Sequence, residues 1–239
     1  MAESTEVKLL GLWPSTYALR ARIALNIKQV NYAFLEENLG AKSELLLKSN
    51  PVHMKVPVLL HGDKPICESL IIVQYIDDVW TSGPSMPPSH PYDRAIARFW
   101  AAYIDEKWGP TTKAIDAVIV AGEGEEAKKA AVDKVYDILV LLEEAFKKCS
   151  KGKAFFGGDR MGYLDMAFGS CLGWLRFREK LHDIKLLDPA KTPQLVKWAE
   201  RFCEHPAVVG VMPETEQLAT IEYGKGLIAK VRGANPSKW

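Results

Sequence analysis

The first part of the chain pairs a short apolar run with an amphipathic segment and then repeats the arrangement. Residues 7–12 (Val-Lys-Leu-Leu-Gly-Leu) predict a strand, which a Pro-Ser pair ends at Ser15. Serine is a common helix N-cap, so we expect a helix over 16–28 with an apolar stripe of Leu19, Ile23 and Ile27. A second strand at 32–35 and a short helix at 43–50 follow.

The clearest hairpin signal of the chain lies at residues 57–67. Two short runs rich in apolar residues surround the pair Gly62-Asp63, which is a typical two-residue turn. Ser69 is then expected to cap a helix whose apolar positions recur at helical spacing, namely Ile72, Tyr75, Ile76 and Val79. The predicted order of elements in residues 1–80 is therefore β, α, β, α, β, β, α.

The pattern changes at residues 81–92. This segment holds four prolines, a glycine and three serines, a composition that resists regular structure and predicts a linker. Beyond it the alternating strand pattern disappears, and residues 93–239 are expected to be entirely helical. The helical stripes predicted there are Ile96, Phe99, Trp100, Tyr103 and Ile104, then Val132, Val135, Tyr136 and Leu139, and then Leu195, Trp198, Ala199 and Phe202.

The charge balance narrows the classes of partner. Lys and Arg number 31 against 30 Asp and Glu, and a net charge of +1 gives no general attraction to nucleic acid or anionic lipid. The acidic start of the chain fits neither a signal peptide nor a transit sequence, and no apolar run approaches the roughly 20 residues of a membrane span. We therefore expect a cytosolic protein with no nucleic-acid or membrane partner.

The cysteines and histidines are too scattered to indicate a metal or dithiol site. The four cysteines form no CxxC pair, and the five histidines show no ligand spacing. We expect reduced and mostly buried thiols, no metal and no bound cofactor.

Longer motifs give the sequence a family resemblance. Residues 13–15 (Trp-Pro-Ser), 50–59 (Asn-Pro-Val-His-Met-Lys-Val-Pro-Val-Leu) and 65–72 (Pro-Ile-Cys-Glu-Ser-Leu-Ile-Ile) closely resemble the plant tau class of glutathione transferases. Residues 98–101 (Arg-Phe-Trp-Ala) and 155–158 (Phe-Phe-Gly-Gly) resemble its helical domain. The resemblance implies a thioredoxin-like domain over 1–80, a linker over 81–92 and an all-helical domain over 93–239. It also implies conjugation of glutathione, the cosubstrate, to small hydrophobic electrophiles, with peroxidase activity as a possible side reaction.

The resemblance also implies a glutathione site. Its contacts would be Ser15 at the thiol, Lys42 and Lys55 at the glycyl carboxylate, the backbone of Val56 in the cis-proline bend Val56-Pro57, and Glu68 and Ser69 at the γ-glutamyl end. Taken singly, each of these has an ordinary structural explanation. The lysines would be solvated surface charges, and Val56-Pro57 would be an ordinary trans peptide bond at the start of a strand. Ser69 would be a helix cap, with Glu68 as a favourable charge in the first turn.

Ser15 is the residue to which the resemblance assigns the chemistry. Its hydroxyl would donate a hydrogen bond to the glutathione thiolate and lower the pKa of that thiol, aided by the positive end of the helix. The nucleophile would then be glutathione itself. A plain N-cap role for Ser15 is the alternative. Arg20 also matches a family position near the site, although a place on the helix surface explains it equally well.

The electrophile pocket is expected between the two domains. By resemblance, its lining residues would be Leu12, Pro14 and Tyr17 from the first domain and Lys113, Trp174 and, more weakly, Trp108 from the second. Aromatic residues at such spacings are also typical of a core, so the spacing itself leaves both readings open.

Three positions depart from the usual family pattern. Thr16 replaces a proline, which would loosen the start of the first helix slightly. Gly109-Pro110 is expected to kink or end the first long helix of the second domain and to widen the pocket. Gly162 replaces Ser or Thr ahead of Asp165, so we expect that helix to be capped by backbone alone.

Two other functions remain open from the sequence. A non-catalytic carrier would bind small hydrophobic ligands in the same cleft without turnover. A thiol transferase or dehydroascorbate reductase of the same fold would need a cysteine where this chain has Ser15. The resemblance also implies a homodimer, with the first domain of one subunit against the second domain of its partner. The physiological electrophile is not indicated.

Overall fold

The computed structural model describes residues 6–232 and begins with a four-stranded mixed sheet. Its strands are β1 (Val7–Gly11), β2 (Ala33–Glu36), β3 (Val58–His61) and β4 (Lys64–Cys67), in the spatial order β2-β1-β3-β4. β1 runs parallel to β2 and antiparallel to β3, and β4 closes the predicted hairpin with β3. Residues 1–5, which bear on the targeting expectation, lie outside the described residues.

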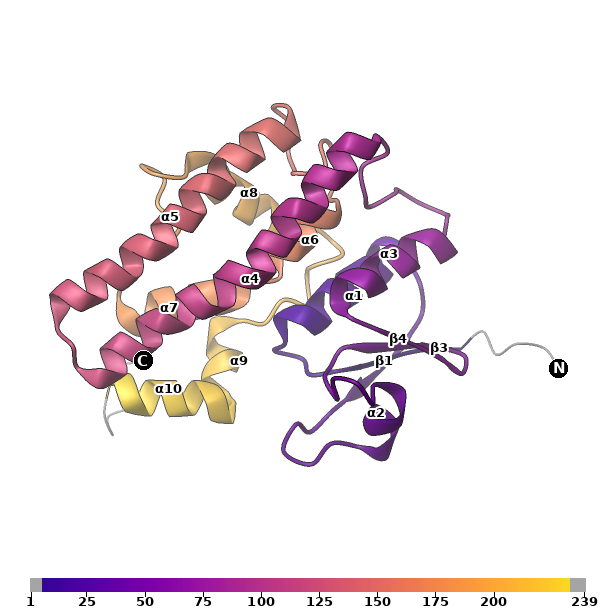
Figure 1. Cartoon of the computed structure of the whole chain (residues 1–239), viewed down its shortest axis with the longest axis horizontal. Helices are drawn as coiled ribbons and strands as arrows, with labels where there is room; N and C mark the ends of the chain where they lie inside the picture. Colours follow the sequence, from indigo (N-terminus) through magenta and orange to yellow (C-terminus); the bar gives the residue numbers. More distant parts are fainter. Residues whose placement is uncertain (1–5, 233–239) are drawn as a thin grey trace.

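Helices cover both faces of this sheet (Figure 1). α1 (Thr16–Ile27) and α3 (Ser69–Val79) pack on one face, where Leu9 and Leu59 point into the main core. α2 (Glu44–Ser49) lies on the other face, where its Leu46 joins a small cluster with Leu10. Neighbouring residues of a strand point to opposite faces, so β1 serves both layers. The predicted β-α-β-α-β-β-α order is confirmed.

The second part of the described chain is helical. It comprises α4 (Pro91–Ala121), α5 (Glu125–Ser150), α6 (Tyr163–Gly169), α7 (Leu172–His182), α8 (Pro193–Glu204), α9 (Thr215–Thr220) and α10 (Glu222–Arg232). Figure 1 shows α4 and α5 side by side as the longest elements, with α10 near the far end of α4. Because α4 already begins at Pro91, the exact limits of the linker and the domains stay a prediction.

The predicted stripe of α4 is partly wrong. Ile104 is buried, but Phe99 is 59% exposed, and the buried side of the helix instead follows Ala97, Ala101 and Trp108. Alanines occupy this side because helices that approach closely leave room for small side chains only. The α8 stripe is buried as expected, and in α5 Val135 and Leu139 are buried while its other stripe residues are only partly so.

Gly109-Pro110 does not end the helix, which excludes one of the two expected outcomes, and a kink at this point stays a prediction. α4 continues through Pro110 to Ala121. Proline has no N–H to give to the carbonyl of Glu106, but both residues are exposed, so water can satisfy that carbonyl. Trp108 and Thr112 are buried on the opposite side, and their packing holds the helix together across the missing bond.

Gly162 is the N-cap of α6 and, as expected, makes no side-chain capping bond, while the buried carboxylate of Asp165 inside the helix reaches back to the backbone ahead of it. Asp165 accepts hydrogen bonds on Oδ2 from the N–H groups of Gly157 and Gly162, both at 2.9 Å. Its Oδ1 accepts from the Phe156 N–H at 2.8 Å and from Trp198 Nε1 at 2.7 Å. Burial raises the pKa of Asp165 to about 6 despite these donors. Asp165, three residues into the helix, thus makes the bond to the N-cap N–H, whereas Gly162 offers no side-chain oxygen where Ser or Thr would accept.

The segment between α3 and α4 is fixed to both parts of the molecule. Asp77 of α3 forms a buried ion pair with Lys28 at 2.8 Å and accepts from the Met86 N–H at 3.0 Å and the Ser85 hydroxyl at 2.9 Å. The carbonyl of Met86 in turn accepts from the Tyr163 N–H at the start of α6, at 2.8 Å. The linker is thus attached to the first part through Asp77 and to the helical part through Tyr163.

Candidate functional site

Ser15 lies at the junction between β1 and α1. Its Oγ accepts a hydrogen bond from the Ala18 N–H at 3.2 Å, so it is the N-cap of α1. A hydroxyl that accepts one bond keeps its own proton for donation. Ser15 also lines a cleft between the two parts of the chain, so the cap role and a role toward a ligand are compatible.

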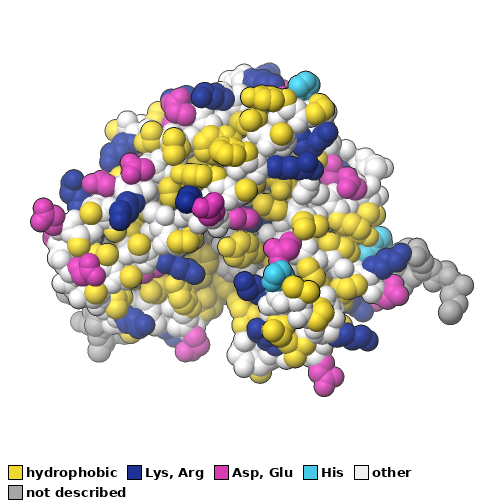
Figure 2. Space-filling model, in the orientation of Figure 1, with side chains coloured by type: hydrophobic (Ala, Val, Ile, Leu, Met, Phe, Trp, Pro, Cys, Tyr) yellow, Lys and Arg dark blue, Asp and Glu magenta, His cyan; other side chains and the backbone are white. Residues whose placement is uncertain are grey.

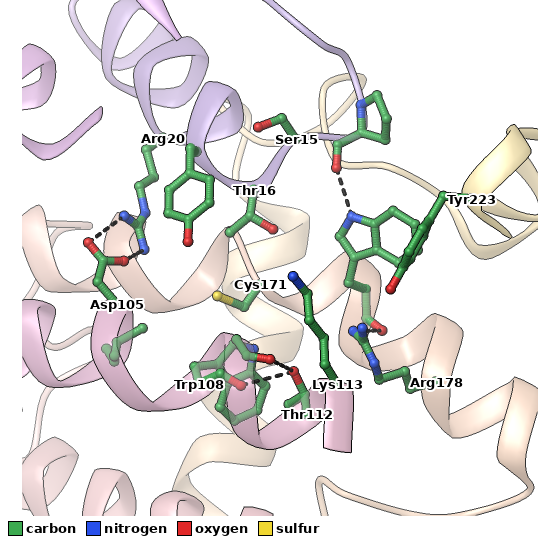
Figure 3. Close-up of a pocket in the computed structure, with 15 residues that line it drawn as sticks. Ser15, Thr16, Arg20, Asp105, Trp108, Thr112, Lys113, Cys171, Arg178 and Tyr223 are labelled. Carbon is green, nitrogen blue, oxygen red and sulfur yellow. Dashed lines mark hydrogen bonds and ion pairs between the residues drawn. The ribbon is translucent and has the colours of Figure 1, made fainter. Parts of the chain in front are cut away.

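This first cleft, which we call the aromatic cleft, has a volume of about 280 Å³. Of the residues expected in the electrophile pocket, Pro14, Tyr17, Trp108, Lys113 and Trp174 all line it. Leu12, contrary to expectation, does not line it; its backbone carbonyl accepts from the Ser15 N–H at 2.9 Å in the turn that leads to α1. Figure 3 shows Trp108 and Lys113 of α4 on the side of the cleft opposite Ser15 and Thr16.

Aromatic rings form one wall of the aromatic cleft. Trp174 makes edge contacts with Phe177 and Tyr223, each with ring centroids 5.3 Å apart. The indole Nε1 of Trp174 donates to the Pro14 carbonyl at 2.8 Å (Figure 3). Tyr223 comes from α10, late in the chain, and no sequence motif indicated it. Such a wall favours flat, apolar ligands.

A second cleft of about 270 Å³, which we call the polar cleft, lies beside the first. It collects four of the expected glutathione contacts, Lys55, Val56, Glu68 and Ser69. The peptide bond between Val56 and Pro57 is cis, as the resemblance implied. Lys42 is exposed and does not line this cleft. Tyr17 and Asp105 line both clefts, so the two are continuous parts of one site.

Ser69 is not the cap of α3, contrary to expectation. The N-cap is Glu68, whose backbone has a φ of 69° and whose side chain makes no capping bond. Ser69 is the first helical residue, and its hydroxyl accepts instead from Arg20 Nη1 at 3.3 Å. A left-handed glutamate is uncommon and costs on the order of 1–3 kcal/mol, which fits a functional constraint at this turn.

Arg20 is buried, so its placement on the helix surface is wrong. It is 1% exposed and forms a double hydrogen bond with Asp105 of α4, at 2.6 and 3.1 Å. Its other donors reach Ser69, the Ala167 carbonyl at 2.8 Å and the Ser170 hydroxyl at 3.3 Å. One guanidinium at the wall of the aromatic cleft therefore joins α1, the start of α3 and the helical part.

Burial keeps the thiols and the phenol of the site in their protonated forms near neutral pH. Burial raises the pKa of the Cys171 thiol to about 11 and raises the pKa of the Tyr17 hydroxyl above its ordinary value. Burial also raises the pKa of Cys67 beside the polar cleft. A reactive cysteine needs a lowered pKa, so these thiols are unsuited to be nucleophiles.

Comparison with known proteins identifies the family. Residues 5–78 match the N-terminal domain model of glutathione S-transferases, and residues 93–206 match the C-terminal domain model. Glutathione S-transferase U18 of Arabidopsis thaliana is 58% identical over 226 residues, which are 94% of this chain and 97% of that protein. Glutathione S-transferase U17 of the same plant is 59% identical over 228 residues, or 95% and 98%. A tau-class glutathione S-transferase structure from mango, Mangifera indica, is 64% identical with a TM-score of 0.87, covering 94% and 99% of the two chains.

The chain belongs to the tau class of the glutathione S-transferase family. A solved rice glutathione transferase in complex with glutathione is also similar, with 35% identity and a TM-score of 0.80 over 90% of this chain and 96% of that one. The transferase fold thus explains the order of the strands and helices and the position of the two clefts.

Two further properties of this transferase concern membranes and metals. Within residues 6–232, no helix has the length and apolarity needed to cross a bilayer. The same residues bring together no group of three or more His, Cys, Asp or Glu side chains suited to holding a metal ion.

Proposed function

We propose that this transferase joins the thiolate of glutathione to small, largely apolar electrophiles, and that Ser15 stabilises the thiolate. The observation that carries the proposal is the position of the Ser15 hydroxyl. It lies at the positive end of α1, in the aromatic cleft, next to the polar cleft in which the expected glutathione contacts gather. A hydrogen bond to the charged form of a thiol lowers its pKa.

We assign the polar cleft to the glutathione backbone. Lys55 complements the glycyl carboxylate, and Val56 pairs through its backbone with the cysteinyl amide. Ser69, in the first turn of α3, complements the γ-glutamyl carboxylate, and Glu68 accepts from the adjacent amine. Lys42 is assigned a weaker, more distant contact with the glycyl carboxylate, because it is exposed beyond the cleft.

The reaction then follows from this arrangement. Glutathione loses its thiol proton to solvent, and the sulfur keeps its electron pair while Ser15 donates a hydrogen bond to it. The sulfur forms a bond to the electrophilic carbon. In a substitution the leaving group then departs with its bonding pair. In an addition the electron pair of the carbon–carbon π bond takes up a proton instead. Pro14, Tyr17, Trp108 and Trp174 hold the electrophile beside the sulfur. No protein atom changes its covalent bonds.

Ser15→Ala tests the catalytic role. A charge-assisted hydrogen bond is worth roughly 1.5 to 3 kcal/mol, so kcat/KM for conjugation of a halonitrobenzene should fall on the order of ten- to a hundredfold. The pKa in the pH–rate profile should rise toward that of free glutathione. The glutathione KM should change much less, since the remaining contacts are intact.

Ser15→Thr is the matched control, because it keeps both the hydroxyl and the cap to Ala18. Unfolding in urea shows whether loss of the cap, worth about 1 kcal/mol, accounts for any change. Conjugation by Ser15→Ala at the wild-type rate with an unshifted pKa would contradict the role of Ser15. Saturable binding of electrophiles by the wild type without any conjugation would favour the carrier function instead.

We also propose that the transferase is a homodimer that uses a surface shared by both domains. Arg98 of α4 donates to the Gln74 amide oxygen of α3 at 3.1 Å, which brings these helices together at the surface. Apolar side chains stand exposed around this contact, with Ile71 at 55%, Phe99 at 59% and Tyr92 at 66%. Figure 2 shows apolar side chains spread over the upper end of α4. Exposed apolar patches of this kind mark interaction surfaces.

Light scattering on Phe99→Asp tests the dimer. A buried, unpaired carboxylate at the interface should shift the mass from that of two chains to that of one. Leu141→Asp, at an exposed leucine of α5 outside this surface, should leave the mass unchanged. A monomeric wild type would contradict the proposal. We place the protein in the cytosol, which fractionation of cells that express it would test.

A further inference from the structure

The charges that line the aromatic cleft are unevenly matched. Three cationic side chains line it, Arg20, Lys113 and Arg178, against a single carboxylate, Asp105. Arg20 is paired with Asp105, at 2.6 Å. Arg178 is paired behind the cleft with the buried Asp116, at 2.9 Å. The two arginines are therefore already neutralised by carboxylates of α4.

Lys113 has no such partner among the described residues. The interactions of residues 6–232 give it no ion pair and no hydrogen bond. Figure 3 shows its side chain extending from α4 into the cleft, with the ammonium group pointing toward the start of α1. The cleft therefore holds one uncompensated positive charge, on a flexible stem that can follow a ligand.

The other polar groups of the cleft do not compensate this charge. Asp116 also accepts the contact from His182 Nε2, at 2.7 Å, and is buried away from the cleft lining. Burial raises the pKa of the Cys171 thiol to about 11, so it carries no negative charge near neutral pH. The aromatic rings of Trp174 and Tyr223 supply apolar surface beside the ammonium group.

We infer that Lys113 selects electrophiles that carry both an aromatic ring and a carboxylate remote from the reacting carbon. The ring meets the wall of Trp174 and Tyr223, and the carboxylate meets the ammonium group of Lys113. Lys113 is exposed, so with a neutral ligand water continues to solvate this charge and the ligand gains no ion pair. The inference rests on the proposed function and adds the substrate class that this cleft prefers.

The probe reaction is aromatic substitution on 4-chloro-3-nitrobenzoate. The thiolate sulfur forms a bond to the ring carbon that bears chlorine, and the ring and nitro group take up the electron pair. The carbon–chlorine bond then breaks, and chloride leaves with its bonding pair. The carboxylate is unchanged throughout. 4-Chloro-3-nitrobenzamide reacts in the same way but is neutral, so the two probes differ mainly in charge.

The experiment compares kcat/KM for the acid and for the amide at saturating glutathione and fixed ionic strength. The variants are Lys113→Met, which removes the charge but keeps the stem, and Lys113→Arg, which keeps the charge. Lys107→Met is the control, because Lys107 is an exposed lysine of the same helix outside the cleft lining. Lys113→Met should lower the acid-to-amide ratio about two- to fivefold, as expected for one partly exposed charge pair. Lys113→Arg and Lys107→Met should keep the wild-type ratio.

An unchanged ratio in Lys113→Met overturns the inference. Equal losses for acid and amide, or a raised glutathione KM in this variant, also overturn it, because Lys113 would then act on glutathione. In each of these outcomes, conjugation by the wild-type protein would still support the proposed function. Wild-type protein that conjugates neither probe nor 1-chloro-2,4-dinitrobenzene would overturn the proposed function as well.

Discussion

The indole nitrogen of Trp174 donates a hydrogen bond of 2.8 Å to the carbonyl of Pro14, the residue directly before Ser15. The bond joins α7 of the helical domain to the turn that begins α1. Arg178 lies over the same indole, with its guanidinium carbon 5.9 Å from the ring centroid. The helical domain therefore supports the position of Ser15 as well as forming the electrophile pocket.

Replacing Trp174 with Phe should separate these two roles. The phenyl ring keeps apolar contact with Tyr223 and Phe177 but cannot donate to Pro14. A net hydrogen bond of about 0.5–1.5 kcal/mol predicts a loss of about two- to tenfold in kcat/KM. Steady-state kinetics with two electrophiles of different size measure it. A loss confined to the larger electrophile would mean that Trp174 affects only pocket shape.

Lys55 should matter more for glutathione than Lys42. Lys55 lines the polar cleft, whereas Lys42 is exposed outside it. Lys55→Ala should raise the glutathione KM about two- to fivefold with little change in kcat at saturation, because a partly exposed charge pair contributes roughly 1 kcal/mol or less. Lys42→Ala, the matched comparison, should raise it less. Equal effects of the two substitutions would contradict the assignment.

Arg20 should be important for stability. Arg20→Met leaves the Asp105 carboxylate without the donors that Arg20 supplies and removes one of the donors to the Ala167 carbonyl. Removing one partner of a buried pair costs about 3–5 kcal/mol, and we expect about 2–3 kcal/mol because Asp105 is 37% exposed. Urea denaturation measures the free energy of unfolding. Lys129→Met, which breaks an exposed pair with Asp133, should change it by less than about 0.5 kcal/mol.

Pro110→Ala should stabilise the protein. Alanine restores the N–H donor to the Glu106 carbonyl, and the exposed position leaves room for it. Proline is about 3 kcal/mol less favourable than alanine inside a helix, but it also reduces the conformational entropy of the unfolded chain. We therefore expect Pro110→Ala to raise the free energy of unfolding by about 1–2 kcal/mol. Thermal unfolding measures it. A lower melting temperature would show that the helix is built around the proline.

Local signals explain why the first domain could be predicted so closely. The serine cap at Ser15 and the Gly62-Asp63 turn each depend on residues a few positions apart, and both are in place. The expectation for Ser69 was wrong for a non-local reason. Its hydroxyl is engaged by Arg20, 49 residues away, and only the packing of α1 against α3 brings them together.

The same distinction explains the site residues that the sequence did not indicate. Tyr223 reaches the aromatic cleft from α10, and Asp105 from α4, and neither lies in a motif. Phe99 was expected inside because it fits a helical period, but the period does not tell which side of a long helix meets its neighbours. Such contacts depend on how the helices pack against one another. That packing involves residues far apart in the chain, so no local sequence pattern indicates it.

The attachment of the linker at Asp77 has a consequence for how ligands enter. Asp77 and Lys28 are 9% and 1% exposed in their side chains, and the same carboxylate also binds the backbone at Met86. Because the linker is bound near its middle to both domains, it does not act as a hinge about which the domains move apart. The site should therefore keep nearly the same width whether empty or filled, and an electrophile would be admitted by its fit to a preformed opening and not by closure around it.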